Sequence, residues 1–392
     1  MLSVELYEAR IPMGRPFRHA LKARTASASV LVAVRGEGAD GWGEAAPREY
    51  VTGESVESVV DALARVPLPG AVAELDRLPL DEALAVLVGL RLPEVLGRGG
   101  EPAPAAAAGL ETALFDFVCR RHGVAGFRAL HRAGFGDVLA QEPAPAPVAT
   151  VLDLGRDPVA YLAALLEADS ALIPHVKLKA GPDVAEAAAL VGRVRALLPA
   201  ATVSVDANGA WETDDVLKCA GELTEAGLSW LEEPLAPRRW RELAALRRAG
   251  LMVMLDESFS SAQDIRACLD HQAADLVNLR VSKCGGPLRL LTLARTAKAA
   301  GLGVQLGVQV GEVGPLWAAG RLIGTGLGSA VAVEAGRQDE WFGPELTRPA
   351  YHVDRRTSRA PALSGPGLGL EPTPELLGRC VPRAVRKVGE DQ

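Results

Sequence analysis

Three short apolar runs, each followed or ended by an acidic residue, decide the fold: ATVSVDANG (201–209), LSWLEEPL (228–235) and LMVMLDES (251–258). Related runs lie on both sides of them, and these are VATVLDLG (148–155), HVKLKAG (175–181), DLVNLRVSKCGG (275–286), GVQLGVQVGE (303–312) and AVAVEAG (330–336). Stretches rich in Ala and Leu follow the runs and favour helices. Strands that alternate with helices in this way indicate βα units and a parallel sheet.

The polar residues that close the last seven runs recur every 24 to 27 residues, and they are Lys179, Asp206, Glu232, Asp256, Lys283, Gln309 and Glu334. A strand, two turns and a helix need about that length, so eight such units predict an α/β fold of the (β/α)₈ barrel type. An open doubly wound sheet is the rival architecture. It does not explain why nearly every strand closes on a charged or amide residue, whereas the strand ends of a barrel converge on one mouth.

The chain divides into three expected parts. Residues 1–125 are expected to form an α+β capping domain, because strand-like runs give way to helical patterns that end in AAAAGLETALFDFVCRRHG (105–123). Residues 126–350 are expected to form the barrel. Residues 351–392, which contain many Pro, Gly and Arg residues, are expected to pack back on the capping domain.

Composition narrows the class of protein. The chain has 392 residues, 48% of them hydrophobic, and a net charge of −7, which disfavours nucleic acid or an anionic membrane as a partner. It contains no apolar run of about 18 residues, so no membrane span is expected, and the N-terminus has no apolar segment typical of a signal peptide. Five scattered Cys residues indicate reduced thiols, so we expect a cytoplasmic protein.

Acidic residues close three consecutive strands. Asp206 closes the first, Glu232–Glu233 the second and Asp256–Glu257 the third. Three carboxylates that meet in one mouth repel one another unless a cation neutralises them, and oxygen ligands suit a hard divalent ion such as Mg²⁺. Because neighbours on a strand point to opposite faces, only one acid of each pair is a ligand, and the spacing leaves open which one.

Lysines accompany the acids. Lys177 and Lys179 share one face of their strand, and Lys283 closes a run four units later. Strands two and six of an eight-stranded barrel lie across from each other, so Lys179 and Lys283 are expected to flank the metal from opposite sides. Lys177 beside Lys179, together with the metal, is expected to lower the pKa of Lys179 towards neutral.

Metal and lysine together indicate abstraction of a weakly acidic proton beside a carboxylate. A base on each face inverts a stereocentre, whereas a single acting lysine allows elimination or lactone opening. A phosphosugar-binding barrel is a rival interpretation, as is a barrel kept as a non-catalytic binding protein. Neither of them explains three acids on consecutive strands.

Five motifs in order, KLK (177–179), DANG (206–209), WLEEP (230–234), LDES (255–258) and SKCGG (282–286), resemble the enolase superfamily, in its muconate lactonizing (mandelate racemase/muconate cycloisomerase) subgroup. IPMGRPFRHAL (11–21) and GWGEAAPREYVTGES (41–55) resemble that family's capping domain. The resemblance covers nearly the whole chain. It implies a Mg²⁺-dependent enzyme, with Mn²⁺ as a substitute, and lysine bases that form a metal-stabilised enediolate.

The resemblance also assigns roles to individual residues. It implies that Asp206, Glu232 and Asp256 are the metal ligands and that Lys179 and Lys283 are the acid/base pair. Lys177 is expected to tune Lys179 or touch the substrate carboxylate, and Asn208 and Glu257 to orient the ligands.

Substrate recognition is expected from capping loops 13–25 and 42–54 and from the last two strands, through His19, Arg24, Tyr50, Gln309 and Glu334. The eighth strand lacks the Asp-x-Asp pair found in dipeptide epimerases of this subgroup, although Glu334 alone still offers a partner for an ammonium. The expected activity is racemisation or epimerisation of an amino-acid derivative or dipeptide, with cycloisomerisation and syn-dehydration as alternatives. The expected partner is a small-molecule carboxylate, in a homo-oligomer.

Overall fold

The computed structural model describes residues 2–19, 23–65, 67–169, 171–334, 336 and 338–389. Eight parallel strands form one sheet in the order in which they occur along the chain. They are β7 (Thr150–Leu152), β8 (His175–Lys179), β9 (Thr202–Asp206), β10 (Trp230–Glu232), β11 (Val253–Leu255), β12 (Leu276–Leu279), β13 (Gly303–Leu306) and β14 (Ala330–Val333). A doubly wound sheet reverses its strand order at a switch point, and this sheet does not.

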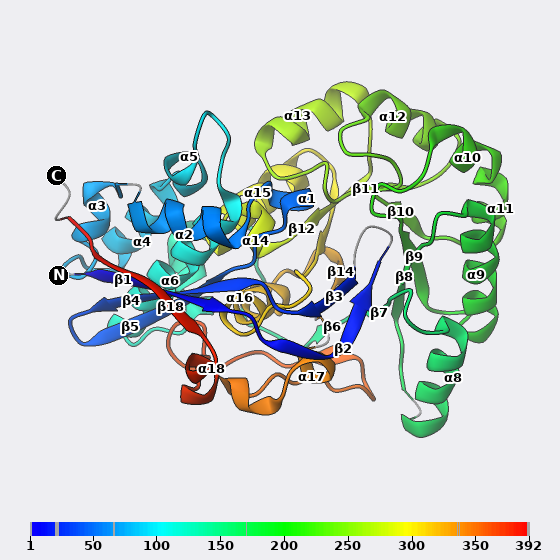
Figure 1. The fold of residues 1–392 in the computed structure, drawn as a ribbon. Coiled ribbons are helices and arrows are strands. Elements are labelled where there is room, and N and C mark those ends of the chain that lie inside the picture. The colour runs from blue at the N-terminus through cyan, green and yellow to red at the C-terminus, as the bar shows by residue number, and fades with distance from the viewer. Residues whose placement is uncertain are drawn as a thin grey trace.

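The sheet closes on itself between its first and last strands. The amide of Ala149, just before β7, donates to the Val333 carbonyl over 2.8 Å, and Ala149 forms a parallel bridge with Glu334. Figure 1 shows the helices that follow the strands arranged along the outside of the sheet. The predicted (β/α)₈ barrel is confirmed.

The helices between the strands follow the expected spacing. They are α8 (Pro158–Asp169), α9 (Val184–Leu197), α10 (Thr213–Lys218), α11 (Ala220–Glu225), α12 (Trp240–Arg248), α13 (Ala262–His271), α14 (Val281–Cys284), α15 (Pro287–Ala299) and α16 (Pro315–Gly324), with α17 (Gln338–Trp341) after β14. Side chains cap the starts of α8, α9 and α13, because Asp157 accepts from the Ala160 amide, Asp183 from the Glu186 amide and Ser261 from the Asp264 amide.

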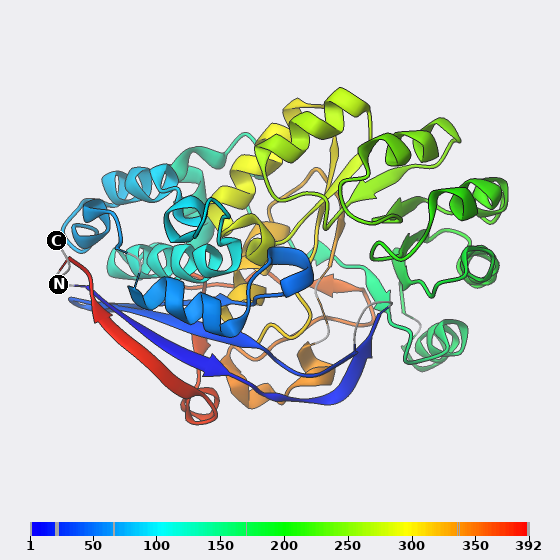
Figure 2. The ribbon, with the colours of Figure 1, turned by 45° about the horizontal axis from the view of Figure 1, so that its top comes forward.

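An antiparallel sheet covers one side of the barrel. Its strands are β1 (Ser3–Ala9), β4 (Ser29–Gly36), β5 (Ala39–Ala45) and the C-terminal β18 (Val381–Lys387), in the order β18-β1-β4-β5. Both termini therefore lie at the same end of the molecule (Figures 1 and 2). The division at residues 125 and 350 stays a prediction.

The N-terminal part of the chain also contributes helices. They are α1 (Glu49–Thr52), α2 (Val56–Arg65), α3 (Gly70–Ala73), α4 (Leu80–Gly89), α5 (Leu92–Leu96), α6 (Pro104–Arg121) and α7 (Gly126–Leu130). Helix α6 is almost entirely buried. It lies so close to β5 that a Cβ on Gly43 would come within 1.9 Å of the Gly109 carbonyl oxygen, which explains the glycine at that position.

A hairpin of β2 (Pro12–Arg18) and β3 (Ala23–Ala26) extends from the N-terminal sheet towards β7 (Figure 1). Arg15 forms an ion pair of 2.7 Å with Asp153, and the Arg18 amide donates to the same carboxylate over 3.2 Å. These contacts hold the hairpin to Asp153, the residue that follows β7. Residues 20–22 of the predicted loop 13–25 lie outside the described part of the chain.

None of the described helices combines the length and apolar character needed to cross a membrane.

Candidate active site

The strand ends bring three acids together in the barrel mouth. Asp206 and Glu232 are the last residues of β9 and β10, and Asp256 follows β11 directly. One carboxylate oxygen of each lies within 4.8 Å of the others, and all three side chains are fully buried. Two residues earlier on these strands, the buried side chains of Ser204, Trp230 and Met254 fill the barrel interior. Because residues two apart on a strand face the same side, the three acids also face the interior, one layer nearer the mouth.

The structure separates the two members of each acidic pair. Glu233 has a φ of 35°, and its carboxylate accepts from the Asp256 amide over 2.7 Å and from Ser258 instead of joining the cluster. Glu257 accepts a 3.1 Å bond from the Asn208 side chain. Both acids therefore support the loops that carry the cluster, and Glu232 and Asp256 are the members that meet Asp206.

Lys177 lies among the acids. Its ammonium contacts Asp206 at 3.0 Å, Glu232 at 2.8 Å and Glu334 at 2.7 Å. Burial acts to lower the pKa of Lys177, but attraction to these three carboxylates outweighs it and raises that pKa above its ordinary value. Lys177 is thus a fixed positive charge, and Lys177 and Lys179 in turn hold the pKa of Asp206 low against the effect of burial.

Lys179 lies at the end of β8 beside the cavity. Its ammonium donates to Asp206 over 2.5 Å and to the Asn208 side-chain oxygen over 3.1 Å. Asn208 therefore joins Lys179 to Glu257, the arrangement expected for a residue that orients its neighbours.

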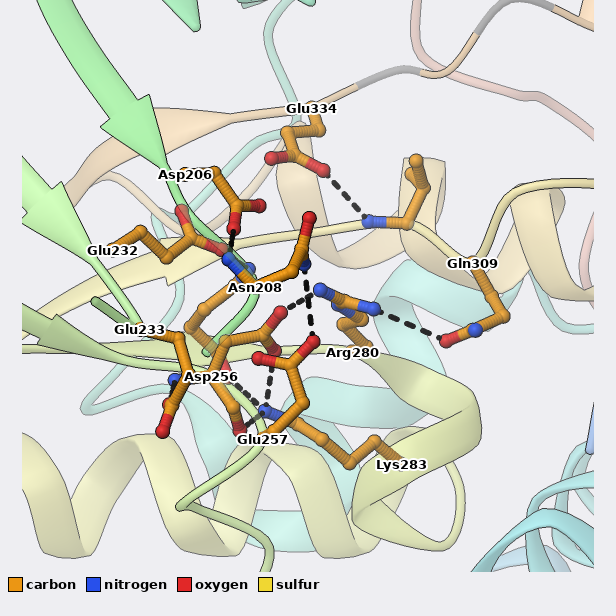
Figure 3. Close-up of polar contacts among 12 residues, drawn as sticks. Asp206, Asn208, Glu232, Glu233, Asp256, Glu257, Arg280, Lys283, Gln309 and Glu334 are labelled. Atoms are coloured by element: carbon orange, nitrogen blue, oxygen red, sulfur yellow. Dashed lines mark hydrogen bonds and ion pairs between the residues drawn. The ribbon is translucent and has the colours of Figure 1, made fainter. Parts of the chain in front are cut away.

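Lys283 does not close a strand, contrary to the sequence-based prediction. Strand β12 ends at Leu279, and Lys283 lies on the short helix α14. Its ammonium donates to the Asp256 carbonyl over 2.5 Å and to the Asp256 carboxylate over 2.9 Å (Figure 3). It also donates to the Asn278 carbonyl over 2.7 Å. Burial lowers the pKa of Lys283 to about 8.

A cavity opens beside the acids. It is lined by Phe17, His19, Tyr50, Val151, Lys177, Lys179, Asn208, Glu257, Arg280, Val308, Gln309, Val310, Glu334, Gly336 and Trp341. Four of the five expected substrate-binding residues are among them. Arg24, which lies on β3, is not part of this described lining.

Glu334 is already engaged by the protein. One oxygen accepts from Lys177 over 2.7 Å and from Gln305 over 3.3 Å, and the other accepts from the Val308 amide over 3.2 Å. Burial acts to raise its pKa, but Lys177 and Arg280 outweigh burial and lower it. The carboxylate is thus ionised and committed to these donors.

The sequence analysis missed three residues that hold the cluster. Asn278 and Gln305 donate to the two oxygens of Glu232 over 2.8 and 3.1 Å. Arg280 forms an ion pair with Asp256 and donates to Gln309 over 3.4 Å (Figure 3). Two of them could have been predicted from strand alternation. Asn278 and Arg280 follow Leu276 at intervals of two, so all three side chains are expected on the same face of the strand.

The donor set fits a divalent metal. Six carboxylates (Asp206, Glu232, Glu233, Asp256, Glu257 and Glu334) and four cationic side chains (Lys177, Lys179, Arg280 and Lys283) form one connected network. Within this network Asp206, Glu232 and Asp256 offer carboxylate oxygens within 4.8 Å of one another, and oxygen ligands are those that Mg²⁺ prefers. Burial raises the pKa of Glu257 to about 8 and that of Glu233 to about 7, and the neighbouring Asp206 carboxylate adds to both shifts.

The fold and the position of these side chains define a (β/α)₈-barrel enzyme, whose active site lies at the carboxyl ends of the strands. The family model of enolase C-terminal domain-like proteins matches residues 160–376. The chain belongs to the enolase superfamily, in the branch of the racemases and muconate cycloisomerases.

Known relatives agree with this assignment. The chain is 30% identical over 309 residues to the aromatic dipeptide epimerase of Herpetosiphon aurantiacus, covering 77% of this chain and 80% of that protein. It is 28% identical over 391 residues to muconate cycloisomerase 1 of Rhodococcus opacus, covering 95% of each. The fold matches the N-succinyl Arg/Lys racemase of Bacillus cereus with a TM-score of 0.79, at 22% identity and 98% coverage of each chain. These curated relatives are isomerases.

Proposed function

We propose that the protein is a Mg²⁺-dependent isomerase of a small carboxylate, with Lys179 moving the proton on the carbon next to that carboxylate. The observation that carries the proposal is the triad of Asp206, Glu232 and Asp256, whose oxygens lie within 4.8 Å of one another with Lys179 directly beside Asp206. The three acids are the proposed ligands, and Mn²⁺ is the expected substitute. A bound divalent ion stabilises negative charge on a substrate carboxylate.

The surrounding residues have separate roles in this proposal. Lys177 keeps its charge and fixes the positions of Asp206 and Glu232. Asn208 orients Lys179 by accepting one of its N–H bonds. Lys179 lines the cavity and would therefore lie beside a bound substrate. Once its ammonium has lost a proton, the neutral amine can accept a proton from the substrate carbon.

The cavity walls support a substrate whose far end is neutral or apolar. Phe17 and Trp341 form an edge-to-face pair with ring centroids 5.8 Å apart, and Val308 and Val310 also line the cavity. Burial, together with Lys179, lowers the pKa of His19 to about 4, so its ring is neutral at pH 7. Because Glu334 is committed to Lys177 and Val308, a dipeptide with a free ammonium lacks its expected partner.

Two kinds of isomerisation are compatible with this proposal. Racemisation or epimerisation of an N-substituted amino acid and cycloisomerisation both include proton transfer at the carbon next to a carboxylate. Relatives of both kinds are found. The side chain on the wall across from Lys179 is Arg280, which favours cycloisomerisation because an arginine does not accept a proton.

Hydrogen exchange tests the proposal. The protein is incubated in D₂O with Mg²⁺ and, separately, with N-succinyl-L-arginine, L-Ala-L-Glu and muconolactone, and deuterium is followed by NMR. We expect deuterium next to the carboxylate of at least one probe, lost on chelation of the metal. Absence of exchange with every probe, or exchange that is independent of metal, would contradict the proposal.

A further inference from the structure

Two cationic side chains follow β12, and only one of them reaches the cavity. Arg280 lines the cavity together with Lys179, whereas Lys283 is not among the described lining residues and is fully buried. The side chain that faces the substrate from this strand is therefore an arginine.

Strand alternation explains why Arg280, and not Lys283, faces the cavity. The side chain of Asn278 donates to Glu232 and so faces the barrel interior. Arg280, two residues later, keeps this direction, and the chain then turns into α14. The Lys283 side chain extends from this helix to the Asp256 backbone, whose carbonyl accepts from its ammonium.

The ammonium of Lys283 has no donor left for a substrate. It has three N–H bonds, and its three acceptors are the carbonyls of Asp256 and Asn278 and the Asp256 carboxylate. Two of these are backbone atoms, so they tie the end of β12 to the residue after β11. Lys283 is a positioning residue for Asp256.

Arg280 lies across the mouth from Lys179. In the closed sheet β8 and β12 are separated by three strands on either side, so their ends lie opposite each other. The guanidinium is held by Asp256 and Gln309 (Figure 3). A guanidinium attracts an anion but does not give up its proton in a protein.

We propose that the site has a single proton carrier, Lys179, and a fixed cation, Arg280, on the facing wall, so that protons leave and return on one face of the substrate. This rests on the proposed function. The C–H bond next to the carboxylate breaks, its electron pair stays on the substrate, and the proton bonds to the Lys179 nitrogen. The reverse step restores the same face, which fits cycloisomerisation and does not invert a stereocentre.

The two hydrogens of a CH₂ group next to a carboxylate distinguish one face from two. Muconolactone carries such a group, and the wild-type protein with Mg²⁺ in D₂O is expected to exchange one hydrogen only. N-succinyl-L-arginine, if it exchanges, is expected to remain in the L form. Exchange of both hydrogens at comparable rates, or loss of optical activity at the rate of exchange, would overturn the inference.

Variants of the two cations sharpen this test. Arg280→Lys supplies a second proton carrier, so exchange on the other face is expected to rise at least about tenfold, since a positioned base contributes about 10²- to 10⁴-fold. Arg280→Met is the matched control and gains no such exchange. Lys283→Gln, which keeps donors for the two carbonyls, and Lys283→Met are expected to exchange the same single hydrogen, whatever their rates. Two-face exchange in wild type that disappears in Lys283→Gln would make Lys283 the second carrier.

A crystal structure of the Mg²⁺-loaded protein with muconolactone decides the same point without turnover. We expect the Arg280 guanidinium in the cavity and the Lys283 ammonium on the carbonyls of Asp256 and Asn278. A Lys283 ammonium in the cavity would refute the inference. If no probe exchanges, the proposed function fails for these probes, while the crystal structure still decides between Arg280 and Lys283.

Discussion

At the scale of single residues, the main feature of the site is that its buried carboxylates are compensated by neighbouring cations. Asp206, Glu232 and Asp256 have no exposure to water, and such a cluster is tolerated only when cations and hydrogen bonds compensate it. Lys177 supplies part of this compensation to Asp206 and Glu232, and Lys283 supplies part to Asp256. Lys179 and Arg280 add to it at Asp206 and Asp256, and a divalent ion held by the three carboxylates would complete it.

The proton carrier gives the first prediction. Lys179→Ala removes the only lysine expected to exchange a proton with substrate, so the exchange rate is expected to fall by at least about 10³-fold. The protein should remain folded, although loss of the ion pair with buried Asp206 is expected to lower its thermal unfolding temperature. NMR exchange and circular dichroism measure the two quantities.

The matched control is Lys218→Ala, which removes an exposed lysine paired with Asp215. It should leave exchange at the wild-type rate. A Lys179→Ala protein that retains wild-type exchange would remove Lys179 from the mechanism.

The ligand set gives the second prediction. Asp206→Asn removes one of three carboxylates, so the affinity for Mg²⁺ is expected to fall by at least about 100-fold, judged against the about 10- to 100-fold that loss of an outer support costs. Calorimetric titration of Mg²⁺ measures this. Asp215→Asn, at an exposed acid, is the control. Equal affinities in wild type and Asp206→Asn would place the metal elsewhere.

At the scale of elements, the repeat length and strand ends were sufficient to predict the barrel and the meeting of three acids. Alternation along β12 was sufficient to predict Arg280 as an inward residue, but the end of that strand was placed too late. The sequence analysis therefore placed Lys283 at the end of a strand beside the metal. In the structure Lys283 lies on α14, and its ammonium contacts the Asp256 carbonyl. Local pattern does not fix where a strand gives way to a one-turn helix, because that depends on tertiary acceptors such as the Asp256 carbonyl.

Contacts between distant elements were beyond the sequence pattern. Glu334 was expected to be open to an ammonium, yet it accepts from Lys177 on the second strand of the barrel and from Val308 after the seventh. Arg24 was expected over the mouth, yet it is not part of the described cavity lining. In both cases the outcome depends on how the barrel closes and how the hairpin lies on it.

Helix α6 shows how buried acids join elements. Glu111 on α6 accepts from the amides of Leu288 and Arg289 at the start of α15. Asp116, one and a half turns later, accepts from the amides of Trp42 on β5 and Leu368 in the C-terminal segment. One helix thus connects the N-terminal sheet, the barrel and the tail.

Glu111 gives the third prediction, on pH. Burial raises its pKa to about 8 from an ordinary 4.5, so between these values the folded state keeps a proton that the unfolded state loses. The stabilisation that this proton provides is complete below pH 4.5 and is lost as the pH rises towards 8. Wild type should therefore lose about 1.4 kcal/mol per pH unit relative to Glu111→Gln over this range.

Urea unfolding of both proteins at several pH values measures the difference. A constant difference between wild type and Glu111→Gln from pH 5 to 8 would show that Glu111 is ionised when folded.

At the scale of the whole molecule, the capping strands and the barrel together make one cavity. Phe17 and Tyr50 come from the N-terminal part, and Lys179 and Arg280 from opposite sides of the barrel. The expected homo-oligomer and cytoplasmic location stay predictions.

Metal binding couples this site to global stability, which is the fourth prediction. Mg²⁺ at 100 times its dissociation constant should stabilise the folded state by about 2.7 kcal/mol, because the unfolded chain lacks the assembled carboxylates. Thermal unfolding with Mg²⁺ and with a chelator measures the shift. Asp206→Asn should lose the shift at that concentration, and an equal shift in both proteins would contradict a site at Asp206.

The most direct test of the central claim is anomalous diffraction from crystals soaked in Mn²⁺. The account predicts a strong peak between the carboxylates of Asp206, Glu232 and Asp256, with Lys179 beside it. No peak among these three carboxylates in crystals that bind Mn²⁺ at another place would contradict it.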